Sequence, residues 1–353
     1  MGKGNSKSSF FKKVIISLMT LFLLSAVIGG WSLYKFAYKP NTNFTDKKNR
    51  YLYIKSTDTF QDILNQLSEK GIIKDLNTFK FIAEYKKYPD KIKPGKYQIK
   101  QGIGNNQLVN LLKAGFSEKI KLNFYNLNTP QEFAGRVAKH TEADSIKILE
   151  EIISADFEEK YGISQAAALS LVIANEYELE WSTSCQELFK LLKDQYKAFW
   201  NEERTKKAEK LGLTQTECSI LASIVQKEQT QHPEERPNIA SVYFNRLKSG
   251  MKLQADPTVI YAVGDFTINR VLNKHLEVNS PYNTYKNEGL PPGPICIPTK
   301  NALDAVLNLP QNNYLFFCAR ADLSGYHTFT KDYQSHLVCA RKYQQALDKR
   351  GIK

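Results

Sequence analysis

The sequence has few cysteines, and they are scattered along the chain. Cys185, Cys218, Cys296, Cys318 and Cys339 are odd in number and form no C-x-x-C pair. A zinc site or a dense disulfide framework is therefore not expected. Cys218 and Cys339 lie in helical patterns and Cys318 lies in an apolar strand pattern, so we expect most of the five to be small buried residues.

Several motifs of common enzyme classes are also missing. The chain has no Walker loop, no G-x-G-x-x-G, no H-E-x-x-H and no G-x-S-x-G, so nucleotide-binding, zinc-protease and serine-hydrolase functions lack their usual support. The formal net charge of +13 over 353 residues would suit nucleic acid, an anionic membrane or an acidic polymer. Because the lysines are dispersed and no zinc-finger or homeodomain pattern accompanies them, we expect a solvated basic surface and no nucleic-acid partner.

One long apolar run lies near the N-terminus. Residues 14–34 carry no charge, and as a helix they are long enough to cross a lipid bilayer with a hydrocarbon core of about 30 Å. Lysines precede the run, and Trp31 and Tyr34 stand at its far end as interfacial anchors. We therefore expect residues 1–13 to be a cytoplasmic tail, and the chain after Pro40 to lie on the outer side of the inner membrane.

Two features complicate this interpretation. Lys35 and Lys39 follow the run and weaken the charge asymmetry across it. A cleaved signal peptide is the alternative, but the run is longer than a usual signal core and no clear A-x-A site follows it. An uncleaved single-pass anchor is the favoured prediction.

After a linker at 35–50, residues 51–117 have the pattern of a small mixed module. The expected elements are a strand at Tyr51–Ile54, a helix opened by Thr59, a helix at Thr78–Tyr85, a strand at Gly95–Ile99 and a closing helix at Asn106–Ala114. The β-α-α-β order resembles a LysM-type glycan-binding module. No single residue compels carbohydrate binding, because such units serve many roles.

Residues 118–210 are expected to form a largely helical connecting region. Lys119–Asn126 has the pattern of a strand, and a strand-like break is expected near Leu169–Ile173. The chemistry-bearing motifs follow from Leu211 onward, and we expect the catalytic domain at 211–350.

The first of these motifs is a helix that ends in a glutamate. Thr214 and Glu217 form a T-x-x-E capping box, which predicts the start of the helix. Glu228 falls three and four residues after Val225 and Ile224, which belong to the apolar stripe. Its carboxyl is therefore expected on the buried face of the helix.

A carboxyl in such a position has a definite chemical use. Burial raises the pKa of a carboxyl, and a protonated glutamate facing a cleft can protonate a glycosidic oxygen at neutral pH. Gln226 and Lys227 are expected to point away from the apolar face. The alternative is a helix-end Glu228 paired with a basic neighbour such as Arg246, and periodicity alone favours this second interpretation.

Further candidates follow along the chain. A helix is expected at 237–248, with Asn245 and Arg246 near its end as possible ligands of sugar hydroxyls, although a solvated arginine is ordinary there. Asp256 precedes Pro257, which is typical of an N-cap followed by the first helical residue. We expect Asp256 to cap a helix, with any substrate contact as a second role.

The end of the chain combines a rigid loop with a hairpin. Residues 280–295 hold four prolines and two glycines, which excludes regular structure. An aromatic wall for sugar rings and a purely structural loop are nearly equal interpretations. A buried strand is expected at 314–319 and a returning strand at 326–330, where His327 is expected to be a satisfied structural histidine.

The motifs together resemble a known family, the endolytic murein transglycosylases of the MltG/YceG kind. The segments that carry the resemblance are LASIVQKE (221–228), VYFNRL (242–247), LQADPTVIY (253–261), SPYNTY (280–285), GLPPGPI (289–295) and HTF (327–329). The resemblance covers essentially the whole chain, and it implies an α+β catalytic domain. One segment departs from the family pattern: Ala174–Tyr177 replaces a usual P-[ND]-T-Y, which puts any substrate contact from it in doubt.

The resemblance implies cleavage of peptidoglycan glycan strands between N-acetylmuramic acid and N-acetylglucosamine, leaving a 1,6-anhydro end. By position in the I-V-x-K-E motif, Glu228 would be the catalytic acid and then the base, with neither a metal nor a cofactor. Gln226, at a position often acidic in the family, would be dispensable for proton transfer. Residues implied in substrate binding are Asn245, Arg246, Gln254, Asp256, Tyr282, Asn283, Thr284, Tyr285 and His327.

The implied partners are the glycan strands, the bilayer through residues 14–34, and penicillin-binding proteins of the cell-wall synthesis machinery. Two alternatives remain open. A hydrolytic muramidase would use the same acid with water as the nucleophile, and a non-catalytic envelope scaffold would use only the anchor and the LysM-like unit.

Overall fold

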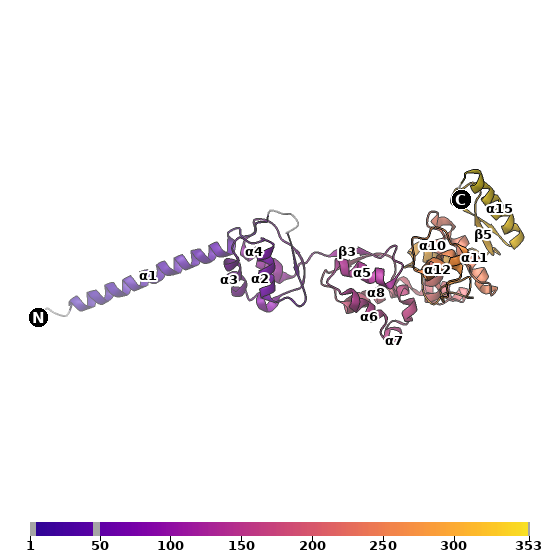
Figure 1. Cartoon of the computed structure of the whole chain (residues 1–353). Coiled ribbons are helices and arrows are strands. Elements are labelled where there is room, and N and C mark those ends of the chain that lie inside the picture. Colours follow the sequence, from indigo (N-terminus) through magenta and orange to yellow (C-terminus); the bar gives the residue numbers. More distant parts are fainter. Residues whose placement is uncertain (1–4, 45–49, 352–353) are drawn as a thin grey trace. The chain divides into compact units, whose positions relative to one another are not determined.

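The computed structural model describes residues 5–44 and 50–351 of the chain (Figure 1). The chain divides into two compact units. The first runs to Ile120 and includes Glu180–Ser182, and the second comprises Lys121–Leu179 and the chain from Thr183 onward. Both units combine helices with short two-stranded sheets, so the fold is α+β, as expected.

The first unit begins with one long apolar helix, α1 (Asn5–Tyr38). Its segment Phe10–Tyr38 contains an 18-residue window with a mean hydropathy of 2.2 and is long and apolar enough to cross a membrane. The helix continues four residues beyond the uncharged run 14–34. It ends just before Pro40, whose ring and missing N–H disfavour a further helical turn.

The β-α-α-β order expected for the rest of the first unit is present. The elements are β1 (Tyr51–Ile54), α2 (Phe60–Glu69), α3 (Leu76–Tyr85), the 3-10 helix η2 (Pro89–Lys91), β2 (Gly95–Gln98) and α4 (Asn105–Ala114). β1 and β2 are antiparallel, with Tyr51 opposite Gln98. Thr59 caps α2 through a capping box with Asp62, and α4 ends at Gly115 in the left-handed conformation. The helices and strands enclose one apolar core.

The second unit starts with a helical subregion that has its own core. Its elements are β3 (Ile120–Asn123), α5 (Pro130–His140), α6 (Ser145–Ile152), α7 (Phe157–Tyr161), the 3-10 helix η3 (Gln165–Leu171), β4 (Glu176–Leu179) and α8 (Cys185–Phe199). The strand-like break expected at Leu169–Ile173 is wrong. Residues 167–171 are buried within η3, so their apolar character reflects complete enclosure by neighbouring elements and not strand pairing. The strand that pairs with β3 is β4, which begins five residues after η3.

The remainder of the second unit surrounds a second core. Its elements are α9 (Glu202–Leu211), α10 (Gln215–Glu228), the 3-10 helix η4 (Pro233–Glu235), α11 (Arg236–Lys248), α12 (Asp256–Val263), α13 (Asn273–Leu276), α14 (Lys300–Leu307), β5 (Phe316–Ala319), β6 (His327–Thr330) and α15 (Tyr333–Lys349). α10 packs against α11 and α14 at the centre of this region, and α15 packs against β5 (Figure 1).

Two expectations about burial need correction. β5 pairs with β6 in antiparallel register, but every residue of β5 is partly exposed. The strand belongs to a two-stranded hairpin, and α15 packs against it without burying it completely. Of the five cysteines only Cys218 and Cys296 are buried. Cys318 and Cys339 lie in β5 and α15, which have no buried residue, and Cys185 is the first residue of α8.

Candidate active site

The glutamate at the end of α10 is held by its own helix and by the next one. The capping box forms as expected: Thr214 Oγ1 accepts a 3.1 Å hydrogen bond from the backbone N–H of Glu217, and the Glu217 carboxylate accepts one from the Thr214 N–H. Ile224 and Val225 are fully buried, and Glu228 is the last helical residue. The Tyr243 hydroxyl of α11 donates a 2.5 Å hydrogen bond to Glu228 Oε1.

Glu228 lies at the wall of a cavity of about 300 Å³ in the second unit. The cavity is lined by Glu228, Tyr243, Arg246, Leu253, Gln254, Asp256, Tyr285, Phe317 and His336. These residues come from α10, α11, the segment before α12, α12 itself, the proline-rich loop at 280–295, β5 and α15. Its size and its mixture of aromatic and polar groups suit part of a small-molecule or polymer ligand.

The pKa of Glu228 is raised from its ordinary value to about 7. Burial is the largest cause, and the negative charge of Asp256 acts in the same direction. The Tyr243 hydrogen bond and the positive charge of Arg246 oppose the rise. Near neutral pH the carboxyl is therefore present in both forms, so it can donate a proton and later accept one.

Asp256 does not cap α12, which corrects the expectation from the Asp-Pro pattern. The N-cap is Ala255, with extended backbone, and Asp256 is the first residue of the helix with no side-chain cap bond. Its Oδ1 accepts a 2.6 Å hydrogen bond from the Tyr285 hydroxyl. Burial and this bond raise the pKa of Tyr285. The cavity thus contains two carboxyl groups, each paired with a phenol.

Arg246 lies in the cavity wall, but its hydrogen bonds go to the backbone. Its Nε donates to the Leu315 carbonyl and one terminal nitrogen donates to the Leu253 carbonyl, both at 2.7 Å. The Glu228 carboxylate accepts its hydrogen bond from the Tyr243 hydroxyl and not from Arg246. Arg246 therefore fixes the cavity wall and supplies a positive charge to it.

Asn245 has a bracing position outside the cavity lining. Its amide donates 2.9 Å hydrogen bonds to the carbonyls of Asn312 and Tyr314, just before β5. The Asn245 side chain therefore holds the segment that leads into β5 against α11. A direct contact of Asn245 with substrate stays a prediction.

The proline-rich loop sends one of its four candidate residues into the cavity. Tyr285 reaches it, whereas Asn283 and Thr284 are buried. The Asn283 amide donates to the carbonyls of Leu276 and Val278, both at 2.9 Å. These bonds shape the loop from within.

Two more contacts tie this loop to its neighbours. Thr284 Oγ1 accepts a 3.0 Å hydrogen bond from the N–H of Ala255, and the Gln254 N–H donates to the Thr284 carbonyl. Gln254 has a φ of 51°, a strained value for a residue with a side chain. Tyr282 packs its ring 4.6 Å from the ring of Tyr261 and does not line the cavity.

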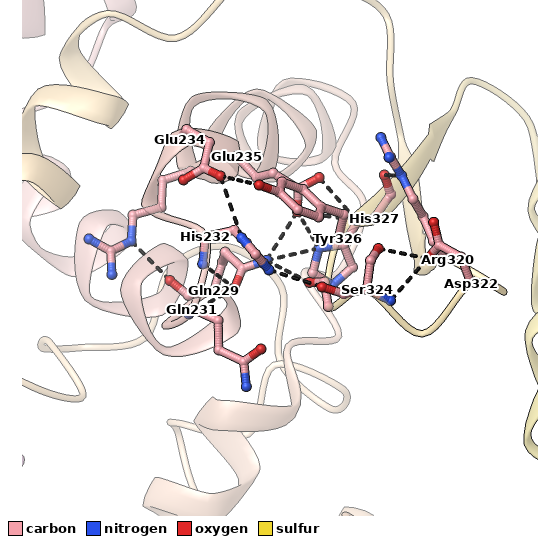
Figure 2. Close-up of polar contacts among 12 residues, drawn as sticks. Gln229, Gln231, His232, Glu234, Glu235, Arg320, Asp322, Ser324, Tyr326 and His327 are labelled. Atoms are coloured by element: carbon pink, nitrogen blue, oxygen red, sulfur yellow. Dashed lines mark hydrogen bonds and ion pairs between the residues drawn. The ribbon is translucent and has the colours of Figure 1, made fainter.

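His327 belongs to a polar network that joins the residue after Glu228 to the hairpin (Figure 2). Its Nδ1 lies 2.9 Å from Glu235 Oε2, and the backbone N–H of His327 also donates a hydrogen bond to the Glu235 carboxylate. Gln229 Nε2 donates to Glu235 Oε2 and to the Gly325 carbonyl, each at 3.0 Å. His327 is outside the cavity lining, as a satisfied structural histidine would be, and its contact with substrate stays a prediction.

The cavity also contains residues that sequence reasoning did not single out. Tyr243 lies within the helix expected at 237–248, and Phe317 lies within the buried strand expected at 314–319. His336 of α15 had no motif around it. Its Nδ1 is buried and has no hydrogen-bond partner among the described residues. The pKa of His336 is lowered, mainly by burial and to a smaller extent by the positive charge of Arg246. A neutral imidazole is thus available to a ligand.

Gln226 is buried, so the expectation that it points away from the apolar face is wrong. Its Oε1 accepts a 2.7 Å hydrogen bond from the N–H of Thr299, the N-cap of α14. A distant backbone donor satisfies the amide, which allows a polar residue on a buried face.

Among the residues that the structure describes, no group of three or more His, Cys, Asp or Glu side chains could hold a metal ion.

The fold and the cavity define an α+β protein whose cavity is lined by a carboxyl with a raised pKa. The chain belongs to the YceG-like family, whose sequence model matches residues 52–342. A solved structure of a YceG-like protein from Listeria monocytogenes is similar with a TM-score of 0.53 and 26% sequence identity, over 82% of this chain and 98% of that one.

Two curated relatives carry the name endolytic murein transglycosylase. One, from Bacillus subtilis, is 46% identical over 123 residues, which are 35% of this chain and 33% of the relative. The other, from Streptococcus pneumoniae, is 28% identical over 88% of this chain and 62% of the relative. The chain thus spans between one third and two thirds of the length of these relatives.

Proposed function

We propose that the chain is an endolytic murein transglycosylase, a lyase that cleaves peptidoglycan glycan strands internally and terminates growing strands. The observation that carries the proposal is Glu228, whose pKa of about 7 and position at the cavity wall suit a group that gives and takes a proton. The relatives with this activity in their names support the same assignment.

The reaction needs one group that changes protonation state. Protonated Glu228 gives its proton to the oxygen that leaves the N-acetylmuramic acid carbon, and the C–O bond breaks. The C6 hydroxyl of the same sugar attacks that carbon, and the Glu228 carboxylate takes the hydroxyl proton. The products are an N-acetylglucosamine end and a 1,6-anhydro end, and no water is consumed.

The other cavity residues have supporting roles in this proposal. Tyr243 orients the Glu228 carboxyl, and the charge of Asp256 raises its pKa and stabilises positive charge on the sugar. Tyr285 and His336 supply hydrogen-bonding groups at the cavity wall. Four further candidates do not line the cavity, namely Asn245, Asn283, Thr284 and Tyr282. They support it indirectly, by holding the segments that form its wall.

The sugar end of the product tests the assignment. The full chain is incubated with uncross-linked glycan strands, and the product masses are measured. We expect anhydro ends, which are lighter than hydrolytic ends by one water. Reducing ends alone would indicate a hydrolytic muramidase, and a digestion pattern unchanged in a folded Glu228→Gln variant would indicate a non-catalytic glycan-binding scaffold.

We further propose that α1 is an uncleaved anchor in the inner membrane, with the rest of the chain on the extracytoplasmic side, and that the β-α-α-β module is LysM-like and binds glycan. The support is the length and hydropathy of Phe10–Tyr38 and the order of elements that follows. Deleting residues 1–34 should release the protein from membranes. We also propose that the protein acts beside penicillin-binding proteins of the cell-wall synthesis machinery.

A further inference from the structure

A second cavity lies inside the first unit, where α1 ends and the module begins. It measures about 300 Å³, and three lysines line it: Lys35 and Lys39 from the end of α1, and Lys74 from the segment before α3. Asp75 is the acidic residue of its wall, and its carboxylate caps α3 by accepting a 3.1 Å hydrogen bond from the Thr78 N–H. The cavity therefore carries an excess of positive charge.

A buried amide network fixes the backbone that carries the three lysines. Asn41 Nδ2 donates a 2.8 Å hydrogen bond to Asn105 Oδ1, and Asn105 Nδ2 donates one to the Phe36 carbonyl. Gly104 allows this close approach, since a Cβ there would lie 2.9 Å from the carbonyl oxygens of Ala37 and Tyr38. The end of α1 is thus fixed to α4, and the cavity is a built feature of the unit.

The cavity lies at a definite depth if α1 crosses a bilayer. The uncharged run 14–34 is about 31 Å long as a helix, which matches the hydrocarbon core. Lys35 is the next residue, and Lys39 is one turn, about 6 Å, further out. Both amino groups therefore fall within the layer of lipid headgroups.

Aromatic residues at the same level support this depth. Phe36 packs edge-to-face against Phe81 of α3 at 6.1 Å, and both rings remain exposed. Lys35 lies over the ring of Trp31 at 4.2 Å. Aromatic rings beside lysines are typical of the membrane interface, so α3 contributes to an interfacial surface together with α1.

We propose that the cavity lined by Lys35, Lys39 and Lys74 binds the phosphate of an anionic glycerophospholipid in the outer leaflet of the membrane. The phosphate would neutralise the surplus charge, and the acyl chains would lie along α1. The module would then be held at a fixed height above the bilayer. The inference rests on α1 being the uncleaved anchor proposed above.

Lipid retention by the full chain tests the inference. The protein is purified in a non-ionic detergent, and native mass spectrometry measures binding of phosphatidylglycerol and of phosphatidylcholine with the same acyl chains. We expect a preference for phosphatidylglycerol of about tenfold or more, because each of the three lysines contributes about fivefold near an anionic headgroup. The triple variant K35Q/K39Q/K74Q should bind both lipids equally.

A matched variant controls for net charge. K55Q/K91Q/K119Q removes the same charge from exposed lysines of the same unit that do not line the cavity, and it should keep the preference. Equal retention of the two lipids by the wild type, or equal losses in the two triple variants, would overturn the proposal. Displacement of phosphatidylglycerol by an equal concentration of inorganic phosphate would show a site for the free anion and would also overturn it.

Two readouts separate this inference from the proposed function. Glycan cleavage by K35Q/K39Q/K74Q should match the wild type, since none of the three lysines lines the cavity of Glu228. The intact mass of the chain extracted from membranes should include α1. Equal retention of the two lipids by the wild type, with both readouts normal, counts against the lipid site alone. An extracted chain that lacks α1 counts against the anchor.

Discussion

The Tyr243 hydroxyl donates a 2.5 Å hydrogen bond to Glu228 Oε1 across the packed helices α10 and α11. The bond favours the ionised carboxylate, whereas burial and Asp256 favour the protonated form. The opposing effects leave the pKa of Glu228 at about 7. A group poised there suits both proton transfers of the proposed reaction.

Tyr243→Phe should move the basic limb of the pH–rate profile to higher pH. Removing the hydrogen bond destabilises the carboxylate, and a bond to a charged group is worth about one pH unit. The measurement is kcat for glycan cleavage between pH 5 and 9. Tyr326→Phe is the matched control, because it removes a 2.5 Å phenol–carboxylate bond to Glu234 outside the cavity. A basic limb that moves equally in both variants, or not at all in Tyr243→Phe, would contradict the role of Tyr243.

Asp256→Asn should move the same limb in the opposite direction. The negative charge of Asp256 raises the pKa of Glu228, so its removal makes the carboxyl more acidic and the rate falls at lower pH. The asparagine Oδ1 can still accept the hydrogen bond from Tyr285, which preserves the cavity wall. A limb shifted upward would show that Asp256 does not act through its charge on Glu228.

Glu228→Gln should abolish cleavage and stabilise the fold at alkaline pH. An unfolded glutamate ionises near its ordinary value of 4.5, whereas folded Glu228 retains its proton to about pH 7. Stability therefore falls as the pH rises from 4.5 to 7 and stays reduced above it. The glutamine avoids this loss, so we expect a gain of about 1 to 3 kcal/mol at pH 8 and little at pH 5.

Thermal unfolding of the full chain in mild detergent at the two pH values measures this effect. Glu288→Gln removes the same charge from an exposed position and should change neither midpoint by much. An equal midpoint for the wild type and Glu228→Gln at pH 8 would contradict a carboxyl whose pKa is raised in the folded protein.

Gly293→Ala should destabilise the second unit because the proline-rich loop passes close to η3. A Cβ at this position would lie 1.9 Å from the Ala166 carbonyl oxygen, so the backbone must shift. We expect a loss of about 2 kcal/mol or more in unfolding free energy. Gly135→Ala, in α5 with no atom within 4 Å of its new Cβ, should instead be neutral or stabilising by about 0.5 to 1 kcal/mol.

Local signals explain what could be predicted from the sequence. The capping box of Thr214 and the spacing of Ile224 and Val225 place Glu228 on the inner face of α10, and the structure confirms that helix. The order of elements in the first unit follows from similar signals, namely the Thr59 cap and the Gly115 stop. In each case the deciding interaction lies within four residues along the chain.

The errors arise where the deciding partner is distant in sequence. Gln226 is buried because the N–H of Thr299 donates a hydrogen bond to its side chain. Asp256 does not cap α12, and its carboxylate instead accepts a hydrogen bond from the Tyr285 hydroxyl. Tyr243 resembles any other residue of an apolar stripe until α11 is packed against α10. His336 enters the cavity only through the docking of α15 on β5. Such contacts depend on tertiary packing, which no short sequence window reports.

The carboxyl pKa of Glu228 can be read by carbon-13 NMR on the full chain labelled at the glutamate side-chain carboxyls. The resonance is assigned by its absence from Glu228→Gln, and its shift is followed from pH 4 to pH 9. A midpoint near 7 is expected for a group that protonates the glycosidic oxygen at neutral pH. A midpoint near the ordinary 4.5 would contradict Glu228 as the protonated acid of this site.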